Sequence, residues 1–318
     1  IFCLILPSIF LLFYFFGYSN HQDFYNSDVE KLDYKIRLVG TDISLDRFYS
    51  GEGHLSTIED LINISSPNKK EKIIFIWPEG ILPGISQDQM QSYDYLFNES
   101  FNENHLLILG INNKSKVNDQ VKYYNSLSVY DHNLYLLNYY NKINLVPFGE
   151  FLPMENLLKN VGLKSLTNNY QSYSKGQKRE IIELNQNNFS IKFLPLICYE
   201  IIYSGKLYKN DDFDIIVNIS EDGWFGQSIG PEQHFVHSIF RAIESGKYVI
   251  RSANNGIAAI VNPLGIVEEK INFNEVGYID FTKMRKIQPT VFSKYGNKIF
   301  GLIILLYIFL IFSFNRIP

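Results

Sequence analysis

The chain has 318 residues, of which 46% are apolar and 15% aromatic, so it can bury a core and is not a disordered chain. Its 29 Lys and Arg against 33 Asp and Glu give a net charge of −4, which argues against nucleic acid as a main partner because phosphate binding needs clustered cations. With only two cysteines, Cys3 and Cys198, a disulfide framework is excluded.

The N-terminal end of the chain is apolar. Residues 1–22 contain no Asp, Glu, Lys or Arg, and Ile1–Gly17 is almost wholly hydrophobic. We interpret residues 1–20 as the end of a longer N-terminal transmembrane region that is truncated in this sequence. A secretory signal peptide is the alternative, but the stretch lacks an initiating Met, a basic start and a small-residue cleavage site.

The C-terminal end has the same character. Ile299–Asn315 is uncharged and lies between Lys298 and Arg316. Because a membrane-spanning helix needs about 20 apolar residues and at least roughly 17, residues 299–315 are predicted to form one. Arg316 beyond it favours a cytoplasmic C-terminus, which would place the intervening domain, residues 21–298, outside the cytoplasm.

Between these ends, short runs rich in Ile, Val, Leu and Phe predict buried strands bounded by turn residues. The runs are Ile36–Val39, Ile73–Ile76, Leu106–Leu109, Leu127–Tyr130, Leu134–Leu137, Ile191–Ile197, Ile215–Ile219, Tyr248–Ile250 and Ile257–Val261. Hairpin turns are expected at Asp131–Asn133 and Asn262–Gly265. Loops are expected in the Asn- and Lys-rich segments Ser66–Lys72, Asn112–Lys122 and Asn185–Asn188.

Helices should fill the gaps between the strands. The clearest signal covers Glu232–Ser245, which follows Pro231 and precedes Gly246. Its apolar residues recur at helical spacing and predict core contacts: Phe235, Ile239 and Ile243. A second helix is expected at Gln87–Asn98. A sheet that carries helices and includes hairpins predicts a layered α/β domain.

Three chemically useful side chains follow predicted strands. Glu79 stands in a Trp-Pro-Glu-Gly turn, where neighbouring prolines favour a rigid, partly dry corner rather than a solvated loop. Lys142, an ordinary surface lysine by default, precedes Glu150 by eight residues, and Cys198 ends the most apolar strand, where a small core residue is the usual interpretation. A carboxylate, an ammonium and a thiol that met could perform nucleophilic acyl transfer, but spacing alone does not prove that they meet.

Other polar and aromatic residues remain open to two interpretations. Trp224 and Phe225 suit either the core or the wall of a binding site. His234 and His237 are three residues apart on the predicted helix, but no third ligand is evident, so no metal is expected. Arg251 is expected to be a structural hydrogen-bonding residue at a strand end, with lining of the pocket as the alternative.

The motifs resemble a known family. Trp77-Pro78-Glu79, the segment from Tyr140 to Glu150 and Cys198-Tyr199-Glu200 are similar to the nitrilase (carbon–nitrogen hydrolase) superfamily, with its Glu-Lys-Cys triad and α-β-β-α sandwich. Three longer motifs resemble the apolipoprotein N-acyltransferase family within it. They are Leu145–Pro153, Asn218–His234 and Arg251–Gly256, and the similarity covers roughly Lys35 to Glu269.

The resemblance implies a role for each matched residue. Cys198 would take an acyl group from a phospholipid such as phosphatidylethanolamine as a thioester, Glu79 would be the general base, and Lys142 would stabilise the oxyanion. Glu150 would orient Lys142. Tyr199 and Glu200 would shape the site around the nucleophile, and Trp224 is a candidate for substrate binding.

The resemblance also implies the partners and the location. The acceptor would be the α-amine of the S-diacylglyceryl cysteine of apolipoproteins, in lipoprotein maturation at the bacterial inner membrane, with the catalytic domain on the periplasmic side. No metal or diffusible cofactor would be required.

The sequence departs from the family pattern at Glu221, where Asn is usual, and at Gly223, where Ala is usual. After the first strand the family commonly has Asn-Ile followed by a Trp, whereas this chain has Asp42 and no Trp follows. These departures bear on acyl-chain recognition rather than on the triad. Two alternatives stay open. One is a soluble amidase that uses water as the acceptor, and the other is a membrane-tethered binding protein with an inactive site.

Overall fold

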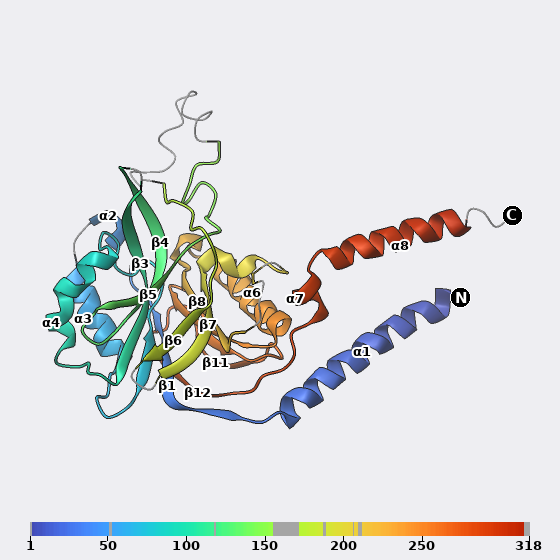
Figure 1. The fold of residues 1–318 in the computed structure, drawn as a ribbon, viewed down its shortest axis with the longest axis horizontal. Coiled ribbons are helices and arrows are strands. Elements are labelled where there is room, and N and C mark those ends of the chain that lie inside the picture. The colour runs from blue at the N-terminus through green and yellow to red at the C-terminus, as the bar shows by residue number, and fades with distance from the viewer. Residues whose placement is uncertain are drawn as a thin grey trace.

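The structure is a computed structural model that describes residues 2–50, 53–117, 119–154, 172–186, 189–205, 207–208 and 212–314. Its strands form one mixed sheet in the order β5-β4-β3-β2-β1-β9-β8-β7-β6, with β12 also paired to β1, β10 to β9, and β11 to β10 (Figure 1). The strands are β1 (Glu30–Thr41), β2 (Ile73–Ile76), β3 (His105–Val117), β4 (Gln120–Tyr130), β5 (Leu136–Asn141), β6 (Ile182–Gln186), β7 (Phe189–Ile197), β8 (Ile215–Glu221), β9 (Tyr248–Asn254), β10 (Ala258–Val261), β11 (Val267–Ile271) and β12 (Gly277–Met284).

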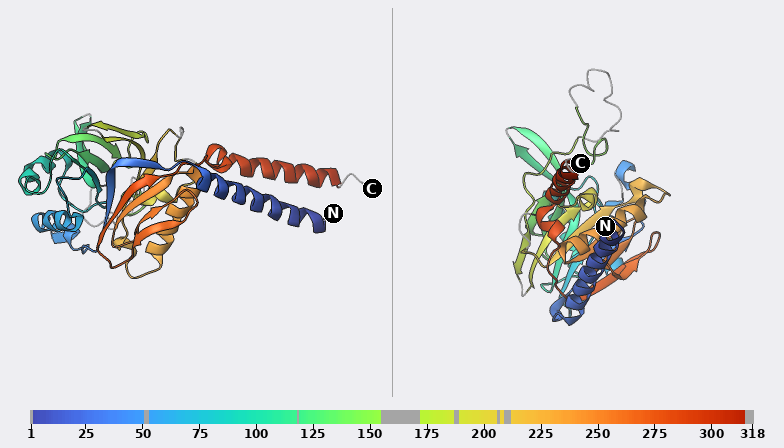
Figure 2. Two further views of the ribbon diagram at one scale, coloured as in Figure 1. Left: turned by 90° about the horizontal axis from the view of Figure 1, so that it is seen from below. Right: turned by 90° about the vertical axis from the view of Figure 1, so that its right-hand side faces the viewer.

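The α-helices are α1 (Phe2–Asn26), α2 (Arg47–Ser50), α3 (His54–Ser65), α4 (Asp94–Phe97), α6 (Gly230–Ser245), α7 (Val291–Tyr295) and α8 (Lys298–Phe314). Helices α3, α4 and α6 pack on the sheet, whereas α1 and α8 project from the domain (Figure 2). Short 3-10 helices are η1 (Gln87–Tyr93), η3 (Cys198–Ile202) and η4 (Gly223–Phe225). The helix predicted at residues 232–245 is confirmed in α6, which begins with Pro231 in its first turn and ends at Gly246 in a left-handed conformation.

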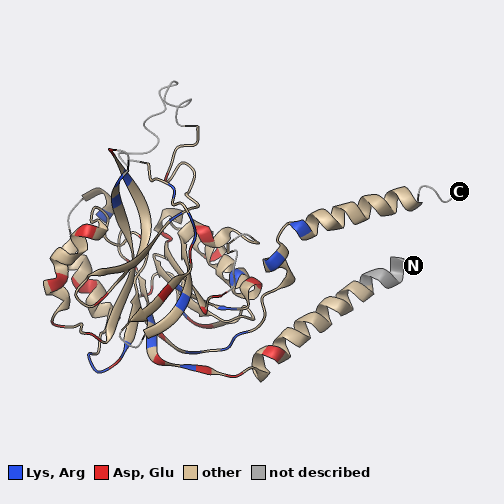
Figure 3. Ribbon diagram, viewed as in Figure 1, with Lys and Arg blue, Asp and Glu red and all other residues tan. Residues whose placement is uncertain are grey.

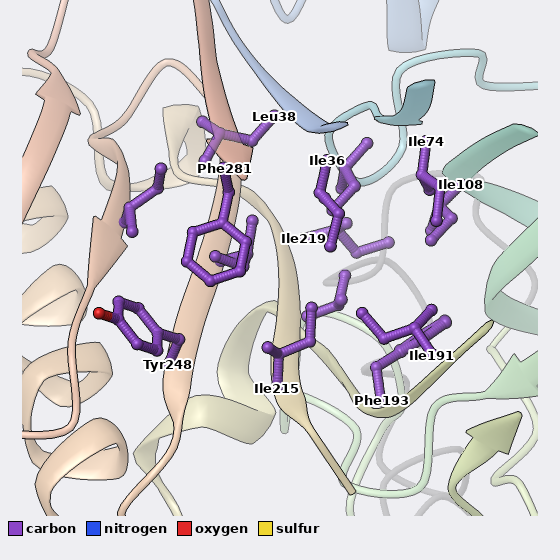
Figure 4. Packing of buried hydrophobic residues seen from close by; sticks show 14 of the residues in the cluster. Ile36, Leu38, Ile74, Ile108, Ile191, Phe193, Ile215, Ile219, Tyr248 and Phe281 are labelled. Atoms are coloured by element: carbon purple, nitrogen blue, oxygen red, sulfur yellow. The ribbon is translucent and has the colours of Figure 1, made fainter. Parts of the chain in front are cut away.

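The core has three parts, which define the layers. The central cluster joins side chains of β1–β4 to those of β7–β9, so the two halves of the sheet face each other across it. Figure 4 shows residues of both halves, such as Ile74 and Ile108 of one and Ile191 and Ile219 of the other. A second cluster packs α3 and α4 on the outer side of β1–β3, and a third packs α6 outside β7–β9. These clusters give the order helix, sheet, sheet, helix, as in the predicted α-β-β-α sandwich.

Several predicted elements need correction. The segment Asn112–Lys122, expected to be a loop, contains residues of two strands: residues 112–117 belong to β3 and residues 120–122 to β4, where partly exposed side chains make polar residues acceptable. Residue 118 lies outside the described part of the chain. Asn185 lies in β6, whereas residues 187–188 are outside the described part of the chain. The helix expected at Gln87–Asn98 is divided into η1 and α4. Ile243 is 40% exposed rather than a core residue.

The terminal helices α1 and α8 project from one side of the domain (Figure 2). Their apolar side chains are exposed over most of their length, and Figure 3 shows the two helices almost free of charged residues away from the domain. Among the described residues, no helix is both long enough and apolar enough to cross a membrane. The transmembrane helices expected at the two ends are therefore not shown. Residues 1 and 315 of those predictions lie outside the described part of the chain.

Candidate active site

Parallel pairing brings the predicted residues to one edge of the sheet. Strands β1, β2, β7, β8 and β9 run in the same direction, because β2 pairs in parallel with β1, β1 with β9, β9 with β8 and β8 with β7. Their carboxyl ends therefore meet at that edge. Glu79 follows β2, and Cys198 follows β7. Lys142 directly follows β5, in the antiparallel hairpin next to β3. Alignment of parallel strand ends is the usual way in which α/β folds assemble a site from distant segments.

Lys142 lies between two carboxylates. Its Nζ is 3.2 Å from Glu79 Oε1 and 3.0 Å from Glu150 Oε1, and its side chain is only 1% exposed. Asn125 of β4 completes the group by donating to the same two oxygens, at 2.7 Å each. Burial opposes a charge on Lys142, but the carboxylates of Glu150 and Glu79 hold its pKa well above the usual value. The lysine is therefore a fixed cation at this site.

The main chain fixes the two carboxylates as well. Glu79 Oε2 accepts a hydrogen bond from the Glu221 N–H at 3.0 Å, and Glu150 Oε2 accepts one from the Val146 N–H at 2.8 Å. On the sheet side, Gly110 of β3 lies against Glu79. A Cβ at position 110 would come within 2.5 Å of the Glu79 Cα, so only glycine leaves room for the turn.

Cys198 is the first residue of η3 and has a left-handed backbone, with φ of 47°. A non-glycine residue rarely adopts this conformation, which costs on the order of 1–2 kcal/mol and recurs at functional sites. The thiol is buried. Burial, and then the negative charge of Glu79, raise its pKa well above the usual value, whereas the charge of Lys142 opposes them. Such a thiol is neutral at rest and needs a base to become a nucleophile.

Glu200, two residues after Cys198, is fully buried in a second ionic group. Its Oε1 accepts from Arg179 Nη2 at 2.6 Å and from the Tyr140 hydroxyl at 2.8 Å. Backbone N–H groups of Ile143, Asn144 and Ile197 also donate to this carboxylate. The predicted supporting residue Glu200 thus connects η3 to the segment after β5. Tyr199 packs at the edge of the central core.

The aromatic residues of η4 are not core residues. Trp224 is 53% exposed and Phe225 43%. The Trp224 ring lies 5.0 Å from the ring of Phe48, which belongs to α2. Of the two interpretations of Trp224 and Phe225, the core position is therefore excluded. Both residues are exposed and closely follow the end of β8, where Glu221 lies.

Of the two histidines on the predicted helix, His234 belongs to a buried polar group. His234 Nδ1 lies 2.8 Å from Asp222 Oδ1, and Arg251 Nη2 donates to Asp222 Oδ2 at 2.7 Å, so these buried residues pair with one another. Across the described part of the chain, no group of three His, Cys, Asp or Glu side chains could hold a metal ion. Arg251 therefore has the structural role expected for it.

Three residues of the site were not predicted from the sequence. Asn125 could have been suspected, since it is a polar residue inside the run Tyr-Tyr-Asn-Ser-Leu-Ser-Val-Tyr, which reads as a buried strand. Arg47 and Arg179 gave no signal, because an arginine in a polar segment is normally a surface residue. Each is paired instead with a carboxylate distant in sequence, Glu221 or Glu200.

Comparisons with known proteins identify the family of this chain. The sequence profile of the carbon-nitrogen hydrolase family matches residues 35–285. A protein named apolipoprotein N-acyltransferase from Rickettsia prowazekii is 37% identical over 268 residues, which are 83% of this chain and 52% of that protein. One of the same name from Rickettsia bellii is 34% identical over 293 residues, 92% of this chain and 56% of that protein. The chain thus spans about half the length of these relatives.

Solved structures show the same fold. A mutant of an amidase from Nesterenkonia, described with a covalent acetamide moiety at its active-site cysteine, superposes with a TM-score of 0.51 at 13% identity, covering 80% of this chain and 92% of the amidase. Identity this low supports the fold alone. The profile match covers most of the chain and includes the Glu79, Lys142 and Cys198 motifs. The chain therefore belongs to the carbon–nitrogen hydrolase family.

Proposed function

We propose that this chain carries the catalytic part of an apolipoprotein N-acyltransferase. In this proposal an acyl chain moves from a phospholipid to Cys198 and then to the α-amine of the S-diacylglyceryl cysteine of an apolipoprotein. The observation that carries the proposal is the placement of Lys142 between Glu79 and Glu150, beside a buried thiol. The names of the relatives support the choice of acceptor.

The first half-reaction would form a thioester. Glu79 accepts the proton of the Cys198 thiol, and the thiolate attacks the ester carbonyl of the phospholipid. Lys142, together with the backbone N–H that follows the cysteine, stabilises the oxyanion. The tetrahedral intermediate collapses when the protonated Glu79 gives its proton to the departing alkoxide, and lysophospholipid leaves. No charge accumulates on the enzyme over this step.

The second half-reaction would form an amide. The free α-amine of the diacylglyceryl cysteine attacks the thioester carbonyl while Glu79 accepts a proton from the amine nitrogen. The C–S bond breaks, the N-acyl lipoprotein leaves, and the proton on Glu79 returns to the Cys198 thiolate. Glu150 acts throughout by holding Lys142 in place, and Tyr199, Glu200 and Trp224 shape the space around the acyl group.

The proposed location is a bacterial inner membrane. Residues 21–298 would form the catalytic domain on the periplasmic side, with residues 1–20 and 299–315 meeting the lipid. Support comes from the exposed apolar side chains of α1 and α8, which leave the domain on one side (Figure 2). Both substrates are lipids, so an active site held close to the bilayer raises their effective concentration.

The experiment is intact-mass analysis of the detergent-purified chain after incubation with phosphatidylethanolamine, beside Cys198→Ala. We expect an acyl adduct that hydroxylamine removes and that is absent from Cys198→Ala. Addition of a diacylglyceryl peptide with a free α-amine should then discharge the adduct into an amide. A Glu150→Gln protein keeps the thiol but loses the carboxylate charge beside Lys142, so its adduct should form more slowly than that of the wild type.

Other outcomes would identify other functions. If a small amide gives the adduct and water discharges it, while phospholipid does not react, the protein is an amidase. If iodoacetamide does not label Cys198 in the folded protein and no substrate forms an adduct, the site is inactive and a binding function is favoured. Either result would overturn the proposed acyl transfer.

A further inference from the structure

A further ion pair, Arg47–Glu221, is buried next to Glu79. Arg47 of α2 contacts Glu221 at the end of β8 through Nη2 and Oε2, and their side chains are 6% and 1% exposed. The two residues come from segments 174 positions apart in the chain. A buried ion pair is costly to assemble unless the rest of its hydrogen-bonding capacity is met, so its surroundings show what it holds in place.

The arginine ties its own loop to the turn that carries Glu79. Arg47 Nη1 donates to the backbone oxygens of Ile43 at 2.9 Å and Ser44 at 2.8 Å. Its Nη2 lies 3.4 Å from the Gly80 oxygen, in the residue directly after Glu79. One guanidinium therefore connects the segment after β1, the turn after β2 and the end of β8.

The glutamate is held just as firmly. Its carboxylate accepts hydrogen bonds from Asn254 Nδ2 at 2.7 Å and from the Gly223 N–H at 2.9 Å, in addition to Arg47. The backbone N–H of the same residue, Glu221, donates to Glu79 Oε2. A carboxylate fixed by these donors fixes the peptide that orients Glu79.

We propose that the Arg47–Glu221 ion pair is a positioning device for the general base: it aims the Glu221 N–H at Glu79 and keeps this side of the site electrically neutral. The inference rests on the proposed role of Glu79. It also gives a physical meaning to the acidic residue at position 221, since a carboxylate there requires a buried cation and Arg47 supplies it.

Several ionisable groups surround the thiol in the described part of the chain. They include Glu79 after β2, Lys142 and Glu150 after β5, Glu200 in η3, and Glu221 and Asp222 at the end of β8. Glu200 is paired with Arg179, and Asp222 with Arg251 and His234. Loss of the Glu221 charge would leave Arg47 without its counter-charge, so the net charge around the thiol would rise by one.

The test compares Glu221→Gln with the double variant Arg47→Met/Glu221→Gln. Peptide-resolved alkylation of Cys198 by iodoacetamide is followed against pH, together with the rate of acylation by phosphatidylethanolamine. In Glu221→Gln the uncompensated Arg47 favours anions, so alkylation should shift to lower pH. Glu79 becomes a weaker base, so kcat should fall about tenfold with KM nearly unchanged. In the double variant the pH profile should return, while kcat stays low.

Arg37 offers a matched control. It lies in β1 and donates to the backbone oxygens of Ser65 and Ser66 and to both oxygens of Asp280, so its bonding pattern is similar to that of Arg47, with a different carboxylate. Arg37→Met should unfold at lower temperature but keep the pH profile and the kcat per folded molecule. If Glu221→Gln does not fold, Arg47→Lys replaces it, and this variant should keep the profile and lose kcat.

The inference is overturned if Glu221→Gln keeps the wild-type profile and kcat, or if Arg37→Met shifts the profile equally. Failure of the proposed function looks different. In that case the wild-type protein forms no adduct from phospholipid, whereas the alkylation profiles of the variants still decide whether the ion pair acts on the site.

Discussion

Two buried carboxylates flank Cys198, and they differ in how many hydrogen bonds they receive. Among the described residues, Glu200 accepts from two side chains and three backbone N–H groups. Glu79 accepts from Lys142, Asn125 and one backbone N–H. A carboxylate has roughly four lone-pair positions, so Glu200 is saturated and Glu79 has room for one more proton or donor. The first holds the structure together, and the second can react.

The cations paired with the two carboxylates, Glu200 and Glu79, also differ in how freely they can move. Glu200 is paired with Arg179, whose planar guanidinium bonds in fixed directions. Glu79 is paired with Lys142, a compact cation that can also turn towards an oxyanion. Both groups lie at the same edge of the sheet. Glu79 and Glu200 are both buried, so burial does not distinguish them. What distinguishes them is the number of their hydrogen bonds and the kind of cation beside each.

The largest expected effect is on chemistry at the Glu79 group. Lys142→Ala should lower the rate of Cys198 acylation by about 100- to 1000-fold, because the oxyanion loses its cation and two carboxylates are left facing each other. The rate is measured by intact mass at saturating phospholipid. A variant that keeps its rate within tenfold of the wild type would remove Lys142 from the proposed mechanism.

A smaller effect, on stability, is expected at the Glu200 group. Glu200→Gln leaves Arg179 without its counter-charge and turns an amide N–H₂ towards other donors, so the free energy of unfolding should fall by about 3 kcal/mol. Thermal unfolding measures the loss. The acylation rate per folded molecule should change only a few-fold, and a 100-fold loss in fully folded protein would contradict the structural role given to Glu200.

The smallest effect is expected from Tyr140→Phe. Burial, and then the charge of Glu200, raise the pKa of Tyr140, so its hydroxyl stays protonated and donates to that carboxylate at 2.8 Å. Removing one of several donors should cost about 1 kcal/mol in unfolding free energy and leave the acylation rate unchanged. Urea unfolding at two pH values below 9 gives the measurement, and a pH-dependent difference between them would show that the hydroxyl ionises.

The sequence predicted the strands that are buried on both faces. Ile73–Ile76 matches β2 at both ends because all four residues are buried. The strands β11 and β12 were not predicted, because most of their residues are exposed or only partly buried and their alternation of apolar residues is weak. The hairpin of β3 and β4 extends into residues rich in Asn and Lys that resemble a loop, since their pairing comes from the backbone and not from apolar side chains.

Site residues that stand in a sequence motif could be predicted, whereas residues that belong to the site only through tertiary pairing could not. Glu79, Lys142 and Glu150 stand in recognisable motifs, and the structure brings them together. Arg47 and Glu221 are 174 residues apart, and neither the propensity nor the periodicity of one segment contains information about the other. Buried ion pairs of this kind follow from the fold, so they become visible only when the fold is known.

The left-handed backbone of Cys198 bears on how an inactive protein should be made. Alanine at position 198 keeps a Cβ and therefore keeps the conformational cost of a positive φ, so Cys198→Ala should retain the backbone conformation of this position. Glycine removes that cost but also deletes a buried side chain and loosens the unfolded chain. An inactive protein that keeps the shape of this site should therefore carry alanine at position 198, not glycine.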